Sequence, residues 1–455
     1  MAEGGEKEIS DAQKYLLILF MILSGAANTI VYNAQNSTVT ELDGEFGPTN
    51  YKYQHPYMQA LTMFIGEFSV IVAFFYTKKM TAERRQVYEN EKVYQAALGK
   101  SISPIKYFLI VIPASCDFFT STLQYIALNY VDPSIYQMLR GGVILVTALF
   151  SKLILKRQIF TYQYYGCALV FIGIGLVGAS NYIFPQSRES GADDSAAQLI
   201  AMMLIVLSLF FNGGLFVSEE KLLGKFFLIP FQIVGTEGFW GCLIYSIILP
   251  ILSYAHCPLQ SLKSGCVVYP AYGSPDGENK QAFYENQWNI DHATFESPSL
   301  FFKQLGSSPF LLIMVILGVF TIAVYNVCGV NVTKHISSLT RSIVDVSRTL
   351  LVWMVSLIFT WTIGKSNDNY IWENTRVGAI LFELLGFFIL IFGNFVYNGI
   401  IKLPFAMPPQ EAIEDEEEAL LEDQEKDISL QEPQGMYTKQ SSAYRRSTGR
   451  DSFHN

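Results

Sequence analysis

Long apolar segments recur along this chain of 455 residues and are separated by shorter polar stretches. Ten of them approach 20 residues, the length that a helix needs to cross the hydrocarbon core of a bilayer. Because the bilayer holds no water to satisfy backbone polar groups, each spanning segment must be a helix. The predicted spans are 15–34, 57–77, 106–128, 133–155, 161–182, 197–217, 231–253, 308–330, 337–361 and 377–399. The pattern therefore predicts an all-α integral membrane protein with ten transmembrane helices.

The ten spans divide into two sets of five, in residues 15–182 and 197–399. An odd number of spans in each set gives the two sets opposite orientations, which is the inverted-repeat arrangement of many secondary transporters. Residues 1–14 form a short N-terminal segment, and the loop 254–307 is rich in Pro, Gly, Tyr and Asn. We expect this loop to be irregular.

Lysine and arginine are concentrated in alternate loops, which indicates how the chain is oriented across the membrane. The loop 78–106 carries seven of them, whereas 35–56 and 183–196 carry one each. We therefore expect both termini in the cytosol and the loops 35–56 and 254–307 in the lumen.

Two modifications follow from this orientation. Asn36 begins the sequence Asn-Ser-Thr in the first lumenal loop and is predicted to be glycosylated. Cys257 and Cys266 share the long lumenal loop, where a disulfide between them is one of two open alternatives.

The charge lies mainly at the carboxyl end. The net charge is −9, and residues 404–455 hold 12 acidic against 5 basic residues, which accounts for −7. Such an acidic, proline-containing tail buries too little apolar surface to fold and is predicted to be disordered. Glu416, Leu420 and Leu421 fit an acidic dileucine sorting pattern, which predicts adaptor binding. Because the rest of the chain is nearly neutral, nucleic-acid binding has no support.

Two arginines lie at similar depths in corresponding spans of the two sets, Arg140 in 133–155 and Arg348 in 337–361. A guanidinium at the bilayer centre costs about 3 kcal/mol on insertion scales, so each needs an internal partner, a water-filled cavity or an anionic ligand. Gly141 and Gly142 leave room beside Arg140. Since guanidinium groups bind phosphate or carboxylate with two parallel hydrogen bonds, we expect a central cavity for an anionic solute.

Other polar residues share helix faces with these arginines, at spacings of three, four and seven positions. The predicted substrate-binding residues are Arg140, Arg348, Tyr136, Gln137 and Gln124, and the predicted ion-coupling residues are Asp117, Asp345 and Glu67.

The opposing interpretation is that the charges only pair with one another and hold the helices together. Arg348 would then pair with Asp345, and Arg140 with Asp117. Glu67 fits this interpretation better than the functional one, and Arg341 is expected to extend to water at the cytosolic end of its span. No catalytic constellation or metal-ligand spacing is recognisable in the sequence, so we predict neither an enzyme nor a metal or other cofactor.

The sequence LNYVDPSIYQMLRGGVILVTALFSKLILKRQ, followed by TYQYYGCALVFIGIGLVGAS, resembles the solute carrier 35 group of the drug/metabolite transporter superfamily, and its F subfamily in particular. The block PASCDFFTSTLQYIAL is also similar. The similarity extends to specific residues in the first five spans. In the second five spans it is mainly a similarity in the arrangement of the spans. It implies ten helices in two inverted repeats and alternating access, as in nucleotide-sugar exchangers and chloroquine-resistance transporters, but it selects no substrate.

The predicted function is secondary active transport of a small polar or anionic organic solute, nucleotide-sugar-like or another metabolite, across an endomembrane of the Golgi, lysosome or vacuole. Export of amino acids or peptides from an acidic organelle is one alternative, favoured by the dileucine pattern and the buried carboxylates. A non-transporting scaffold that recruits partners through its acidic tail is another. Assembly as a homodimer is left open.

Overall fold

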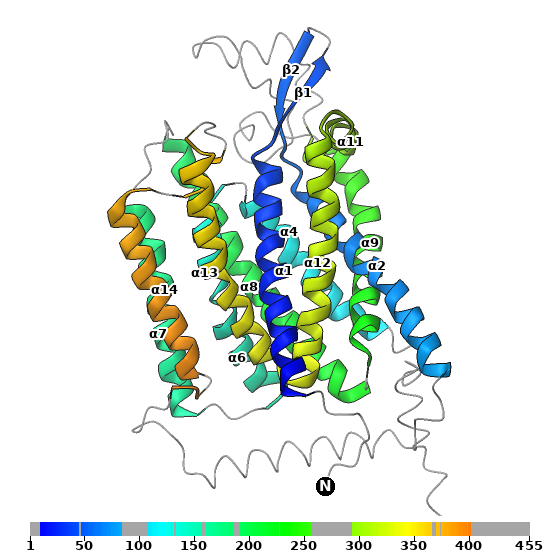
Figure 1. The fold of residues 1–455 in the computed structure, drawn as a ribbon, viewed down its shortest axis with the longest axis vertical. Coiled ribbons are helices and arrows are strands. Elements are labelled where there is room, and N and C mark those ends of the chain that lie inside the picture. Colours follow the sequence, from blue (N-terminus) through cyan, green and yellow to red (C-terminus); the bar gives the residue numbers. More distant parts are fainter. Residues whose placement is uncertain are drawn as a thin grey trace, which may run out of the picture. The chain divides into compact units, whose positions relative to one another are not determined.

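Helices make up most of the chain that the computed structural model describes (Figure 1). The described residues are 10–44, 47–83, 108–128, 130–131, 133–156, 160–184, 192–226, 228–255, 294–365, 370–373, 375–397 and 399–401. They all belong to one compact unit, residues 1–407; residues 408–455 form a second unit outside the described part. Predictions for Cys257, Cys266, Glu416, Leu420 and Leu421 therefore fall outside the described residues.

All ten predicted spans coincide with helix. The helices are α1 Asp11–Asn36, α2 Pro56–Glu83, α4 Val111–Leu128, α5 Pro133–Arg140, α6 Val143–Ile154, α7 Thr161–Ile183, α8 Ala192–Phe226, α9 Pro230–Tyr254, α11 Pro298–Ser307, α12 Pro309–His335, α13 Ser338–Thr362 and α14 Val377–Tyr397. Within the described residues, eight segments are long and apolar enough to cross a membrane, and they lie in α1, α2, α4, α8, α9, α12, α13 and α14. The coarse prediction of a helical membrane protein is thus supported.

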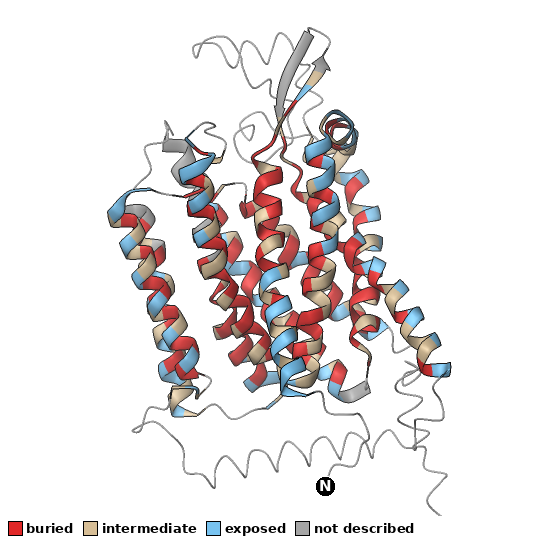
Figure 2. Ribbon diagram, in the orientation of Figure 1, coloured by how far each residue is buried: buried red, intermediate tan, exposed pale blue. Residues whose placement is uncertain are grey.

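The burial of side chains is the reverse of that in a water-soluble protein. Large apolar residues are exposed along the outer faces of the helices, for example Val72 at 69% and Phe320 at 66%. Charged residues are buried in the interior, for example Arg341 and Asp345 at 2% each. Figure 2 shows exposed residues following the outer sides of α12, α13 and α14. Apolar outer faces of this kind match a lipid environment, in which apolar side chains need not be hidden.

The predicted span 133–155 is not one helix. It is divided into α5, which ends at Arg140, and α6, which begins at Val143. Gly141 and Gly142 form the break, where their N–H groups donate to the carbonyls of Met138 and Leu139 at 2.9 and 3.0 Å. A side chain at Gly141 would place its Cβ 3.0 Å from Leu390 of α14, so the glycine also lets α14 pack closely at the break. Arg140 therefore occupies the end of a broken helix.

Close helix pairs hold the described part together. Helix α7 packs along α14, α1 along α12, α2 along α9, and α4 along α8. Gly173 illustrates why α7 and α14 come so close (Figure 1): a Cβ there would lie 2.9 Å from the carbonyl oxygen of Gly386. Small residues that let backbones approach are the usual means of helix association in membranes.

A β-hairpin extends from one end of the helices, which we call the hairpin end (Figure 1). Strands β1 Val39–Gly44 and β2 Gly47–Lys52 are antiparallel, with Val39 opposite Lys52. No strand was predicted here, although β-branched residues such as Val39, Thr40 and Thr49 favour extended backbone. The irregular structure predicted for 254–307 is also incorrect at its end, where Pro298–Ser307 form α11.

Candidate functional site

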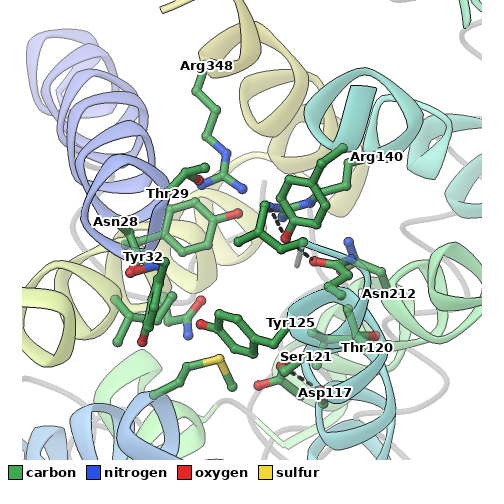
Figure 3. Close-up of a pocket in the computed structure, with 18 of the residues that line it drawn as sticks. Asn28, Thr29, Tyr32, Asp117, Thr120, Ser121, Tyr125, Arg140, Asn212 and Arg348 are labelled. Atoms are coloured by element: carbon green, nitrogen blue, oxygen red, sulfur yellow. Dashed lines mark hydrogen bonds between the residues drawn. The ribbon is translucent and has the colours of Figure 1, made fainter. Parts of the chain in front are cut away.

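A cavity of about 70 Å³ lies among helices of both predicted sets. Its lining comes from seven helices, and Figure 3 shows Arg140 and Arg348 reaching toward the same space from α5 and α13. The polar and charged residues that line it are Asn28, Thr29, Tyr32, Asp117, Thr120, Ser121, Gln124, Tyr125, Tyr136, Arg140, Asn212, Tyr325, Asn326, Arg341 and Arg348. The structure therefore brings the two predicted arginines together.

Arg348 is held firmly on one side of the cavity. Its Nε lies 2.8 Å from Oδ1 of Asp345, an ion pair in which the N–H is not aimed at the carboxylate. Its Nη1 donates to the carbonyl oxygen of Gly25 at 2.8 Å, and its guanidinium lies 4.7 Å from the centre of the Tyr325 ring. Only a glycine leaves space at position 25, because a Cβ there would lie 2.6 Å from Nη1 of Arg348. Arg348 is thus fixed by backbone, carboxylate and ring together.

Arg140 is held more loosely. Its Nη2 lies 3.4 Å from Oδ2 of Asp345, its Nη1 donates to the hydroxyl of Tyr136 at 3.4 Å, and its Nε has no partner in the described part of the chain. The Tyr136 hydroxyl in turn donates to Oε1 of Gln124 at 3.1 Å, whose Nε2 donates to Ser208 at 3.1 Å. Long contacts and a free N–H leave Arg140 able to bind a further acceptor.

Asp345 joins the two arginines. It pairs with both guanidinium groups and accepts a hydrogen bond from the Tyr325 hydroxyl at 2.6 Å. The sequence-based pairing of Arg348 with Asp345 is confirmed. The pairing of Arg140 with Asp117 is wrong, because Arg140 contacts Asp345 of α13 and Asp117 accepts from Ser121 at 3.0 Å. Two guanidinium groups sharing one carboxylate leave a positive charge beside the cavity.

The prediction that Arg341 extends to water is also wrong. Arg341 is 2% exposed, donates to Glu219 of α8 and lies 4.4 Å from the centre of the Phe216 ring. The predicted span ended at residue 217, which left Glu219 in a loop. Helix α8 continues to Phe226, since the Glu, Lys and Leu residues that follow favour helix. Glu219 therefore turns inward and meets Arg341.

The remaining predicted site residues are placed as follows. Glu67 is buried in α2 and accepts from Nδ2 of Asn326 in α12. Gln137 belongs to α5, but its side chain is outside the described part. Asn36 is the last residue of α1; its Nδ2 is buried, and its Oδ1 accepts from Gln59 at 2.8 Å. Glycosylation of Asn36 stays a prediction, and in the folded chain it requires this nitrogen to become accessible.

Several residues of the site were not among those predicted from the sequence. Asn28, Thr29 and Tyr32 form a polar face on α1, and their spacing of three and four along an apolar helix was a readable signal. Asn212 of α8 and Asn326 of α12 are single polar residues in apolar runs. No local pattern marks such single residues as facing a cavity, because their direction depends on how the helices pack.

The positive charge and the hydroxyl and amide groups suit an anionic or polar organic molecule. Ligand pockets generally measure about 300–1,000 Å³. The cavity is smaller than that, with room for a few water molecules in the conformation described. Binding a metabolite therefore requires the helices around the cavity to move apart.

An apolar outer surface, a polar interior and a charged internal cavity define a polytopic membrane protein with an enclosed polar cavity. Comparison with known proteins makes the relationship more specific. The nucleotide-sugar transporter family model matches residues 20–225. Solute carrier family 35 member F6 of Mus musculus is 29% identical over 419 residues, covering 90% of this chain and 96% of that protein. The human member F6 is 28% identical over 389 residues, covering 85% of this chain and 90% of that protein.

A more distant similarity joins this chain to the human UDP-N-acetylglucosamine transporter, which is 27% identical over 143 residues, or 30% of this chain and 43% of that protein. The predicted resemblance to solute carrier 35 proteins is thus confirmed over most of the chain. A solved crystal structure aligns with 86% of this chain and 99% of its own at 10% identity, with a TM-score of 0.45. A TM-score this low does not establish a shared fold.

Proposed function

We propose that the protein is a secondary transporter that moves a small polar or anionic organic solute across an endomembrane. The observation that carries the proposal is the convergence of Arg140 and Arg348 on one cavity, with a single carboxylate, Asp345, between them. Of the two arginines, Arg140 has the longer contacts, so it is the group that we expect the solute to engage. Gln124, Tyr136 and Gln137 would orient its polar parts.

We propose further that the chain has ten spans arranged as two inverted repeats, with α5 and α6 together as the fourth span. The helix pairings support this. Exchanging each span for its counterpart in the other repeat turns the pair α1–α12 into α8–α4, α1–α13 into α8–α6, and α2–α12 into α9–α4, and all of these pairs occur. The pairs α2–α9, α5–α13 and α7–α14 exchange into themselves. Such symmetry is the basis on which repeats of this kind rock around a central site in alternating access.

The substrate class is proposed from the site and from the relatives together. A positively charged cavity suits a phosphate-containing solute, and relatives carry the names nucleotide-sugar transporter and UDP-N-acetylglucosamine transporter. A nucleotide sugar or another anionic metabolite is therefore our first candidate. The location that we propose is an endomembrane of the Golgi, lysosome or vacuole, with both termini in the cytosol.

Further proposals concern the acidic tail, the lumenal loops and the oligomeric state. The acidic tail would bind an adaptor through Glu416, Leu420 and Leu421, and Asn36 would be glycosylated in the lumen. A disulfide between Cys257 and Cys266 and a homodimer are left open.

The test is transport by the purified full-length chain in proteoliposomes, with a panel of nucleotides, nucleotide sugars, amino acids and peptides. Arg140→Ala is expected to reduce uptake of the transported solute roughly 10- to 100-fold, the value of a hydrogen bond to a charged group. Lys152→Ala is the matched control, because Lys152 is exposed on α6, bonds to Tyr164 at 3.0 Å and is not among the residues that line the cavity.

Three results are informative. Loss of uptake in Arg140→Ala but not in Lys152→Ala, at equal protein levels, supports the site. Equal uptake by both variants would remove Arg140 from the binding site. Absence of transport of any solute by the unaltered chain would favour the scaffold alternative.

A further inference from the structure

Four buried carboxyl groups gather beside the cavity, and four different helices contribute them. They are Glu67 of α2, Asp117 of α4, Glu219 of α8 and Glu237 of α9, which we call the carboxyl cluster. All four are at least nine-tenths buried. Figure 3 shows Asp117 on the side of the cavity away from Arg140 and Arg348. The cluster is therefore a separate group of charges that reaches the cavity through Asp117.

The contacts of the cluster are specific. Glu67 accepts from Asn326, Glu219 accepts from Arg341, and Asp117 accepts from Ser121 at 3.0 Å. Helix α9 lies directly against Glu67, because a Cβ at Gly238 would come within 2.8 Å of the Glu67 Cβ. This close approach brings the neighbouring Glu237 to the cluster.

The cluster carries more carboxyl groups than there are cations to balance them. Arg341 is its one guanidinium among the described residues and pairs with Glu219, while Arg140 and Arg348 pair with Asp345. A buried carboxylate without a cation is so unfavourable that the group takes up a proton instead.

Two further observations point to bound protons. Oε2 of Glu67 and Oε1 of Glu237 are buried and have no hydrogen-bond partner in the described part of the chain. The carboxyl groups of Glu67 and Asp117 also lie close to each other. Two neighbouring carboxyl groups in a buried site are strongly unfavourable when both are charged, so one of them keeps a proton.

A proton accounts for these contacts better than a metal ion does. No group of three or more His, Cys, Asp or Glu side chains in the described chain has an arrangement that would hold a metal.

The other titratable or charged groups around the cluster and the cavity are Tyr32 of α1, Cys116 and Tyr125 of α4, Tyr136 and Arg140 of α5, Tyr245 of α9, Tyr325 of α12, and Arg341, Asp345 and Arg348 of α13.

We propose that the carboxyl cluster is a proton-binding site that exchanges protons with the cavity through Asp117 and so couples solute movement to a proton gradient. The coupling rests on the proposed transport function. In the release step the O–H bond of the Asp117 carboxyl group breaks, the proton passes to water in the cavity, and Asp117 remains as a carboxylate. Arg341, which lines the same cavity, then faces this negative charge.

Proton binding can be tested without knowing the solute. Infrared difference spectra of the full-length protein in lipid nanodiscs, recorded while the pH is changed, report the C=O stretch of protonated carboxyl groups. The unaltered protein is expected to show a pH-dependent band that shifts in heavy water. Glu237→Gln and Asp117→Asn should each remove part of it, whereas Glu220→Gln should not, because Glu220 bonds to Ser338 outside the cluster. Thermal unfolding of each variant identifies any that fails to fold, in which case the other decides.

Coupling is then tested in proteoliposomes with the solute that the unaltered protein transports and an imposed pH gradient. The gradient is expected to accelerate flux in the unaltered protein, and the ratio of flux with and without it should fall to one in Glu237→Gln, while solute exchange persists. A band unchanged in both cluster variants, or flux that follows a sodium gradient instead, would overturn the proposal. If no solute is transported, the proposed function fails, and the infrared result still decides proton binding.

Discussion

At the scale of single residues, the site depends on glycines, which leave room for the buried arginine side chains. Gly25 gives Arg348 both its space and a carbonyl acceptor. Gly329 leaves space for the side chain of Arg341, since a Cβ there would lie 2.8 Å from Nε. A buried guanidinium needs room for its side chain and partners that balance its charge. These two glycines are therefore required for the arginines to occupy their buried positions.

Gly25→Ala should displace Arg348, because the new Cβ would lie 2.6 Å from its Nη1 and 2.8 Å from the Tyr325 ring. We expect the free energy of unfolding to fall by about 1–3 kcal/mol, the usual cost of overpacking, and solute flux to fall as well. Gly175→Ala is the control, since nothing lies within 4 Å of its Cβ position. Thermal unfolding in nanodiscs and proteoliposome flux measure the two effects; equal values for both variants would show that Arg348 tolerates displacement.

At the scale of elements, a buried clasp fastens α11 to the start of α2 at the hairpin end. Nδ1 of His55 lies 2.5 Å from Oε1 of Glu296, its Nε2 lies 3.0 Å from Oε1 of Gln304, and the backbone N–H of Met58 donates to Glu296 at 3.2 Å. The ring of Tyr53 packs edge-on against His55, and burial raises the pKa of the Tyr53 phenol well above its usual value. Tyr53 thus stays neutral beside Glu296, and the clasp joins segments that are distant in the sequence.

Glu296→Gln should weaken this clasp, because the substitution removes the carboxylate charge from a contact with no exposure to solvent. The expected loss is about 1–3 kcal/mol of unfolding free energy, the cost of an unsatisfied buried group. The measurement is the thermal unfolding midpoint of the purified protein. Glu41→Gln, at an exposed position of β1, should leave that midpoint unchanged. A midpoint equally insensitive to both changes would mean that the clasp adds nothing to stability.

At the scale of the whole molecule, the cavity, both arginines and the carboxyl cluster all lie within residues 1–407. The proposed transport site and the proposed sorting signal are therefore in separate parts of the sequence, which allows their roles to be tested independently.

Deletion of residues 404–455 should leave solute flux in proteoliposomes unchanged and alter only the location of the protein in cells. Leu420→Ala combined with Leu421→Ala in the full-length chain is the matched variant and should change the location in the same way. The two readouts are reconstituted flux and microscopy of a tagged protein. Loss of flux on deletion would make the tail part of the transport machinery and contradict this separation.

The helices themselves were predictable from the sequence, because an apolar run of about 20 residues and the cost of unpaired backbone in lipid leave no other structure. The candidate arginines were predictable for the same reason, since a cation in an apolar run requires a function or a partner. The break at Gly141 was not, because it depends on the approach of α14. The β-hairpin and the end of α8 were missed although local propensities favoured both.

What the sequence alone determined is thus local: the helical segments, the polar faces within them and the two buried arginines. Only the tertiary structure decided which charges meet. Asp345 reaches Arg140 across 205 positions of sequence and Glu219 reaches Arg341 across 122, and neither pair leaves a trace in local spacing. Helical periodicity fixes the face on which a residue lies, but the neighbour of that face is chosen by the packing of all the helices together.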